Sequence, residues 1–185
     1  TALRFCIKYN VEPDFIVLTD PQYWAYKHID GIKSPSSILI TESAVYPSVF
    51  RFLCKKIICC KSNFPLEHYF DSFRSEKGTL VAGGSVASTA WNFAQYAGAS
   101  EIYVAGLDFA FVNKQTHIKG STFEQATHTT SKRIATAETS NMPILFSGNA
   151  CYEKNYKQEN VLTDQRMKMF AWWFESRLEQ FPDRK

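Results

Sequence analysis

The segment from Thr79 to Phe111 constrains the fold of this chain more than any other stretch. Its sequence, TLVAGGSVASTAWNFAQYAGASEIYVAGLDFAF, places a short β-prone run, Thr79 to Val81, just before a pair of glycines. Gly83 and Gly84 lack a Cβ atom, so the backbone there can turn sharply or approach a ligand closely. Ser85 follows, and serine is a preferred N-cap residue. This order predicts a strand, a tight turn and the start of a helix.

The helix that Ser85 begins is expected to run from about Val86 to Tyr96 and to end at Gly98, because glycine is common just past a helix. The next run, Glu101 to Ala105, is apolar enough for an interior parallel strand. Together these elements predict one βαβ unit, the usual connection between parallel strands. Apolar residues at helical spacing predict that the helix packs through Val86, Ala90, Phe93, Ala94 and Ala97.

The rest of the chain continues the alternation of helices and strands. We expect strands at Phe15–Leu18, Ser37–Thr41, Lys56–Cys60 and Ile144–Ser147, and helices at Thr1–Val11, Gln22–Ile29 and from Thr163 or Asp164 to about Glu179. One or two helical turns are expected within Tyr46–Phe52, and irregular structure in Ser62–Lys77 and in the polar stretch Val112–Thr139.

This alternation predicts an α/β fold of the Rossmann-like, doubly wound kind, with a largely parallel sheet and helices on both faces. The length of 185 residues suits a single domain, residues 1–185. A doubly wound domain normally opens with a strand, whereas this sequence opens with a helical pattern. We therefore expect an upstream strand to be missing and the chain to be excised from a longer protein.

Composition narrows the class of protein. The net charge of +3 arises from 21 basic and 18 acidic residues spread along the chain, which argues against a nucleic-acid partner. No apolar run approaches the roughly 20 residues of a membrane span. The 5 cysteines contain no C-x-x-C pair and are odd in number, so reduced thiols in a cytoplasmic protein are expected rather than disulfides or a zinc site.

Polar residues and glycines follow several of the expected strands, at the edge where α/β proteins bind ligands. A helix N-terminus beside two glycines suits an anion, so a nucleotide phosphate is the first ligand to consider. The glycine turn matches neither a P-loop nor a dinucleotide fingerprint. Asp20 could hold a ribose hydroxyl, a base amino group or a metal, or it could cap an Asp-Pro turn. Asp108 could bond a base or a sugar, or it could be satisfied by backbone N–H groups. Glu42 and Ser43 could be structural. The candidates are Asp20, Glu42, Ser43, Gly83, Gly84, Ser85, Gly106 and Asp108.

The polar stretch contains two candidate catalytic histidines. His117 and His128 lie where a loop could cover a substrate, and histidine is the most common catalytic base near neutral pH. Lys119 adds a positive charge that suits a phosphate or a sugar carboxylate. Both histidines could instead be solvated loop side chains.

Four segments carry a resemblance to a known family: PDFIVLTDPQYW, LITESAVYPSVF, GGSVASTAWNFAQYAGASEIYVAGLDFAF and KQTHIKGSTFE. They resemble the central domain of the Maf family, the motility-associated factors that glycosylate bacterial flagellin. The same domain class includes archaeal 6-hydroxymethylpterin diphosphokinases of the MptE type. The third segment is also similar to bacterial sialyltransferases that use CMP-sialic acid.

The resemblance implies transfer of a CMP-activated nonulosonic, sialic-acid-like sugar to serine or threonine hydroxyls of flagellin. It places Gly84 and Ser85 near the nucleotide phosphate or ribose and Asp108 near the nucleotide, with His117 or His128 as the base and no cofactor firmly implied. An MptE-like enzyme would instead use ATP and magnesium, with Asp20 or Asp108 as a metal-binding carboxylate. A third alternative is a non-catalytic module that docks a flagellar or cell-envelope partner through aromatic surfaces such as Tyr23-Trp24.

Overall fold

The computed structural model describes residues 1–62, 64–75 and 77–180. The chain divides into two compact units, Thr1–Ala97 and Gly98–Lys185. Each unit has its own cluster of buried apolar side chains. The expectation of one domain over residues 1–185 stays a prediction.

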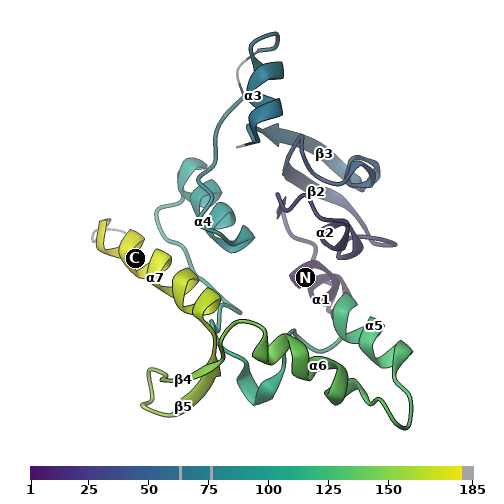
Figure 1. Ribbon diagram of the computed structural model, residues 1–185. Helices are drawn as coiled ribbons and strands as arrows, with labels where there is room; N and C mark the ends of the chain where they lie inside the picture. The colour runs from purple at the N-terminus through teal and green to yellow at the C-terminus, as the bar shows by residue number, and fades with distance from the viewer. Residues whose placement is uncertain (63, 76, 181–185) are drawn as a thin grey trace. The chain divides into compact units, whose positions relative to one another are not determined.

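The first unit is built on a three-stranded parallel sheet with the strand order β1-β2-β3. β2 is the central strand, since Leu39 is paired with Ile16 on one side and with Ile57 on the other. Figure 1 shows β2 and β3 side by side. The parallel sheet confirms the α/β fold class and the three strands expected in this part of the chain. The strands are β1 (Phe15–Leu18), β2 (Lys33–Glu42) and β3 (Leu53–Cys60).

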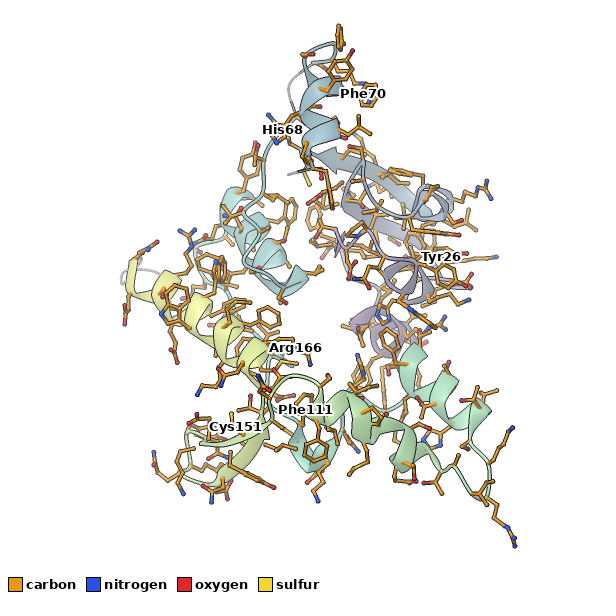
Figure 2. The ribbon with its side chains drawn as sticks, in the orientation of Figure 1. Tyr26, His68, Phe70, Phe111, Cys151 and Arg166 are labelled. Atoms are coloured by element: carbon orange, nitrogen blue, oxygen red, sulfur yellow. The ribbon has the colours of Figure 1, made fainter. Side chains whose placement is uncertain are left out.

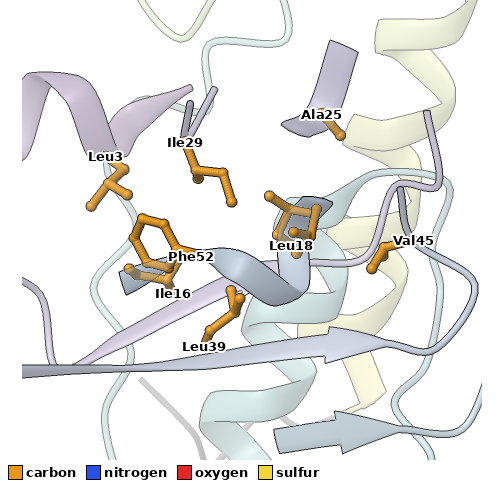
Figure 3. Close-up of a cluster of buried hydrophobic side chains, with 9 residues drawn as sticks. Leu3, Ile16, Leu18, Ala25, Ile29, Leu39, Val45 and Phe52 are labelled. Atoms are coloured by element: carbon orange, nitrogen blue, oxygen red, sulfur yellow. The ribbon is translucent and has the colours of Figure 1, made fainter. Parts of the chain in front are cut away.

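Helices flank this sheet. Leu39 is fully buried in the cluster between one face of the sheet and its covering helices (Figure 3). Val49 belongs to the same cluster and is also fully buried. Successive strand residues point to opposite faces, so Phe15 lies on the face away from Ile16. There its ring packs against Phe93, with 5.1 Å between the ring centroids. The first face is covered by α1 (Ala2–Lys8), α2 (Tyr23–Lys27) and the 3₁₀ helix η1 (Pro47–Arg51), and the second by α4 (Val86–Tyr96).

The connection from the sheet to α4 differs from the expectation. Part of the segment expected to be irregular forms α3 (Pro65–Asp71), with proline at a helix start, where its missing N–H costs nothing. The expected strand Thr79–Val81 is reduced to a single parallel bridge between Thr79 and Lys61. The amide of Val81 donates instead to Asn92 Oδ1 of α4, at 2.8 Å, so the helix side chain takes the place of a strand neighbour.

The helix α4 has the expected bounds but a different buried face. Ser85 is its N-cap, and the Ser85 hydroxyl accepts a hydrogen bond from the amide of Ala87. Its most buried residues are Ser88, Thr89 and Trp91 rather than the predicted alanine and phenylalanine positions. Ser88 is drawn inward because its hydroxyl bonds the backbone at Gly83 and Ser85.

The second unit contains an antiparallel strand pair and three α-helices in its described part. Its buried cluster consists of Phe111, Leu145 and Leu162, with Ala150 and Met167 packed against them. Figure 2 labels Phe111 and also Arg166, which lies in the first turn of the last helix. The elements are η2 (Val112–Lys114), α5 (Thr122–Thr130), α6 (Ala137–Phe146), β4 (Cys151–Lys154), β5 (Asn160–Thr163) and α7 (Gln165–Gln180).

The expected strand Glu101–Ala105 is wrong: these residues have no regular structure. A parallel strand needs a bonded neighbour, and none of the described residues pairs with this run. Tyr103 is 90% exposed, which does not fit a strand buried on both faces. A backbone hydrogen bond to β5 forms beyond this run, where the Phe111 amide donates to the Leu162 carbonyl at 2.7 Å.

The polar stretch after Phe111 is more regular than expected, because two of its hydroxyl residues cap helices. Ser121 caps α5, accepting from the amide of Glu124, and Thr136 caps α6, accepting from the amide of Thr139. The strand expected at Ile144–Ser147 is also wrong, since Ile144 to Phe146 form the end of α6. A short apolar run fits a buried helix as well as a strand.

The last helix, α7, confirms the prediction of a final helix that begins near Asp164. None of the helices in the described part of the chain is long and apolar enough to cross a lipid bilayer. All five cysteines are free thiols.

Candidate polar site at the carboxyl edge of the sheet

The carboxyl end of the central strand holds the first group of polar side chains. β2 ends at Glu42, and Ser43 follows it. Burial raises the pKa of Glu42 above the ordinary carboxyl value, the hydroxyl of Ser62 partly opposes the rise, and the nearby charge of Glu67 adds to it. Glu42 is therefore partly desolvated and lies near polar groups of the segment after β3.

A nearly buried lysine links these groups to α3. The Lys77 ammonium pairs with the carboxylate of Glu67, lies 3.3 Å from Asp71 Oδ1, and donates to Ser43 Oγ at 3.4 Å. The hydrogen bond to Glu67 raises the pKa of Lys77, and the same contact lowers the pKa of Glu67. A single cation of this chain, Lys77, thus pairs with Glu67 and lies within ion-pair distance of Asp71, the two carboxylates of α3.

Sequence reasoning missed Glu67, Asp71, Ser62 and Lys77 because the stretch that carries them was expected to be irregular. Two signals were present. Proline at position 65 is typical of a helix start, and Glu67 and Asp71 are four residues apart, which places them on one helix face.

Asp20 follows β1 and makes the turn contact expected for an Asp-Pro sequence. Its Oδ1 accepts a hydrogen bond from the amide of Gln22 at 2.9 Å. Oδ2 of Asp20 has no hydrogen-bond partner among the described residues. One oxygen therefore shapes the turn, and the other is left as an acceptor for a ligand.

The glycine turn lies at the start of α4. Gly84 has a φ of +84°, a left-handed conformation that favours glycine. The amide of Gly83 donates to Ser88 Oγ at 2.9 Å, and the amide of Ala87 donates to Ser85 Oγ at 3.2 Å. Within the described residues, the N–H groups of Gly84, Ser85 and Val86 have no acceptor, which is the arrangement that binds anions at helix N-termini.

The glycine turn and the Glu42 group are separate clusters. Thr79 bridges Lys61 just past the end of β3, and Gly83 comes four residues later in a segment that is bonded to α4. No hydrogen bond or ion pair joins the glycine turn to Glu42 or Ser43 in the described part of the chain.

The remaining sequence candidates lie in the second unit. Gly106 has a φ of +77°, and Asp108 follows in an irregular segment, so neither stands at a strand end as we expected. His128 is exposed and lies 3.9 Å from Glu124 on the same helix, α5. Lys119 is exposed in the turn before α5.

His117 has the more enclosed surroundings of the two histidines. Its ring lies 4.6 Å from the ring of Phe123, and its Nδ1 is 3.2 Å from the hydroxyl of Thr116. Burial lowers the pKa of His117 below the usual histidine value. The imidazole is therefore neutral at physiological pH, the state that a general base needs.

The carboxylates at the sheet edge do not fit a magnesium site. Lys77 pairs with Glu67 and lies 3.3 Å from Asp71 Oδ1, Glu42 is partly desolvated, and Asp20 offers one oxygen. Across residues 1–62, 64–75 and 77–180, no group of three or more His, Cys, Asp or Glu side chains is arranged to hold a metal ion.

The parallel sheet, the capped helix after a glycine turn and the polar strand ends are those of a Rossmann-like, nucleotide-binding type of α/β domain. The chain belongs to the family described as 6-hydroxymethylpterin diphosphokinase MptE-like, which matches residues 1–114. The match includes Asp20, the glycine turn and Asp108, and it ends before His117.

Two proteins of Treponema pallidum (strain Nichols), both named "Uncharacterized protein", are similar to this chain. The first is 34% identical over 93% of this chain and 51% of the relative, and the second is 24% identical over 95% of this chain and 36% of the relative. The chain therefore spans about half of one relative and about a third of the other. No solved structure matches it.

Proposed function

We propose that this chain is the nucleotide-binding domain of a glycosyltransferase that uses a CMP-activated nonulosonic sugar. The proposed acceptors are serine or threonine hydroxyls of flagellin, as the resemblance to the Maf family implies. The observation that supports the proposal is the glycine turn at the start of α4, where the N–H groups of Gly84, Ser85 and Val86 have no acceptor among the described residues.

The state of the carboxylates favours a CMP-sugar over a nucleoside triphosphate. A triphosphate enters most enzymes with magnesium held by one or two free carboxylates. Here Lys77 pairs with Glu67 and lies 3.3 Å from Asp71 Oδ1. A single phosphate diester can be bound by backbone N–H groups at a helix N-terminus without a metal.

The first test is the affinity for CMP of the Gly84→Ala variant. A Cβ atom at a φ of +84° strains the turn, and the turn can relax only by moving the N–H groups that would bind phosphate. We expect the dissociation constant for CMP, measured by calorimetry, to rise by about tenfold, or ~1.4 kcal/mol.

Gly31→Ala is the matched control. Gly31 has a φ of +72° in the same unit, with nothing within 4 Å of an added Cβ, but it lies in the turn between α2 and β2 at the other edge of the sheet. It should bind CMP as the unchanged chain does. Equal losses in the two variants would mean that strain alone explains the effect, and the proposed phosphate site would be wrong.

In the proposed reaction the acceptor hydroxyl attacks the anomeric carbon of the sugar. The new carbon–oxygen bond forms as the bond to the CMP phosphate breaks, and its electron pair leaves with CMP. The proton of the acceptor hydroxyl goes to a general base, for which His117 is the proposed residue.

Replacing His117 with glutamine should lower the turnover of the whole transferase by about 100-fold, the usual range for loss of a general base. CMP affinity should stay unchanged, since the base does not bind the nucleotide. Because the pKa of His117 is lowered, the unchanged enzyme should keep its activity somewhat below pH 6.5, the ordinary histidine value. His128→Gln is the control, and a larger loss there would move the role of the base to His128.

The family assignment supports a second candidate, ATP-dependent pyrophosphoryl transfer to 6-hydroxymethylpterin. Such an enzyme would form the pterin diphosphate and AMP in the presence of magnesium. Product formation from hydroxymethylpterin and ATP, with no binding of CMP, would replace the glycosyltransferase proposal with this one.

A further inference from the structure

A group of tyrosines lies at the same sheet edge as Asp20. Tyr23 begins α2, which residues 19–22 connect to the end of β1, and Tyr46 follows the end of the neighbouring strand β2. The two rings pack edge to face, with 5.2 Å between their centroids. Both therefore belong to the connections that line the carboxyl edge, where α/β domains bind ligands.

The tyrosines form a fixed platform rather than a set of loose surface rings. Tyr26, labelled in Figure 2, stacks on Tyr46 with 5.4 Å between centroids, and its hydroxyl donates to Asp30 Oδ1 at 2.8 Å. Tyr26 and Tyr46 are partly buried against the main apolar cluster of the first unit. Tyr23 packs on this anchored pair and is still 45% exposed.

Asp20 supplies a polar group in the same connection as Tyr23. It is three residues before Tyr23, and its Oδ1 is used by the amide of Gln22. Its Oδ2, without a partner among the described residues, can accept a hydrogen bond. An exposed ring and a carboxylate acceptor in one short connection suit a planar heteroaromatic ligand that carries an amino group, since the ring can stack and the amino group can donate.

We propose that Tyr23 and Asp20 bind the amino-substituted heteroaromatic ring of the ligand. The inference rests on the proposed function in one respect: cytosine of a CMP-activated donor is the first source of such a ring. Pterin carries the same chemistry, a flat ring with an exocyclic amino group, and is the second source.

The test measures binding of three probes, CMP, UMP and 6-hydroxymethylpterin, to the full chain by calorimetry. Tyr23→Leu should weaken binding of the amino-bearing probe by about tenfold, because it removes the stacking ring. Tyr9→Leu is the matched control, since Tyr9 is an exposed tyrosine of the same unit that packs on a neighbouring ring, Phe5, in α1. It should not change binding.

Asp20→Asn tests the hydrogen bond to the amino group directly, because it keeps the turn and replaces an acceptor oxygen with a donor nitrogen. The amide oxygen can still accept from Gln22, while the amide nitrogen replaces Oδ2 and can only donate. Cytosine presents an amino donor where uracil presents a carbonyl acceptor, so the variant should lose about tenfold in CMP affinity and should bind UMP at least as well as before. Thermal unfolding of each variant shows whether the fold is kept.

The outcomes separate this inference from the proposed function. The proposed site for the heteroaromatic ring, Tyr23 and Asp20, is called the ring site here. If Gly84→Ala weakens CMP binding but Tyr23→Leu and Asp20→Asn leave it unchanged, the ring site is wrong and the glycosyltransferase proposal is kept. Binding of hydroxymethylpterin but not CMP, lost in the Tyr23 and Asp20 variants, would support the ring site and remove the CMP proposal. If neither CMP nor hydroxymethylpterin binds at millimolar concentration, the ring site is wrong.

Discussion

Replacing Leu39 with alanine is expected to lower the free energy of unfolding by about 3.5 kcal/mol, a typical cost for a large-to-small change in a packed core. Leu39 is fully buried and lies on the central strand, β2, between β1 and β3. The helices on its face of the sheet bring Leu3, Ala25 and Val49 into the same cluster. The cavity would therefore open at the centre of the first unit, where little can move to fill it.

Urea unfolding followed by circular dichroism measures the Leu39→Ala effect, and hydrogen exchange of the β1 and β2 amides shows that it arises in the first unit. Leu53→Ala is the matched control, because Leu53 begins β3 but is 59% exposed. The Leu53→Ala change in the free energy of unfolding should stay within about 0.5 kcal/mol. A similar loss in both leucine variants would contradict the position of the core.

Replacing Gly148 with alanine should cost about 3 kcal/mol in the second unit, because the new methyl group meets a buried carboxylate. An added Cβ would lie 2.7 Å from Cγ of Asp164 and 3.0 Å from Nε of Arg166. Asp164 cannot swing outward, since it is fully buried and serves as the cap of α7. Its Oδ1 accepts from the amide of Met167 at 2.9 Å, and its Oδ2 pairs with Arg166 at 2.7 Å.

The Gly148→Ala effect should also depend on pH. Burial alone would raise the pKa of Asp164, but the Met167 amide and the Arg166 guanidinium outweigh it, and the pKa is lowered. A lowered carboxyl pKa contributes stability that is present above the unfolded value of about 3.9 and is lost as the pH falls through the folded value. The difference in the free energy of unfolding between the unchanged chain and the Gly148→Ala variant should therefore become smaller below about pH 4.

Gly78→Ala is the control for this change. An added Cβ at Gly78 comes no closer than 3.9 Å to another atom, the hydroxyl oxygen of Tyr96. The Gly78→Ala change in the free energy of unfolding should stay within about 1 kcal/mol. If hydrogen exchange at the start of α7 is the same in Gly148→Ala and in the unchanged chain, the cap is not disturbed and the prediction is wrong.

The parallel sheet was predictable because each of its strands contains a short apolar run, although β2 and β3 begin several residues before those runs. The segment Phe15–Leu18 is one example, and Ser85 with the glycines before it correctly marked the start of α4. Such signals are local, so a single sequence is enough to find them. The same logic failed at Glu101–Ala105, because an apolar run becomes a strand only where another strand lies beside it.

The helix α5 could have been found from the sequence. Ser121 and Glu124 have the spacing of a capping box, and in the structure Glu124 returns the contact by accepting from the backbone near Ser121, at Gly120. The polar composition of the stretch hid this signal. The contacts of Lys77 with Glu67, Asp71 and Ser43 could not be predicted from the sequence. They depend on how α3 lies against the end of β2, which no local pattern specifies.

β1 has a bonded neighbour on one side only, as the order β1-β2-β3 requires. Along its outer side, Phe15 to Leu18 present peptide groups that no strand in the described part of the chain engages. An open edge of this kind is a template for strand addition, and the brevity of β1 limits how strongly it can recruit another chain. A strand joining there in parallel would extend the carboxyl edge beyond Asp20 without disturbing the packing around Leu39.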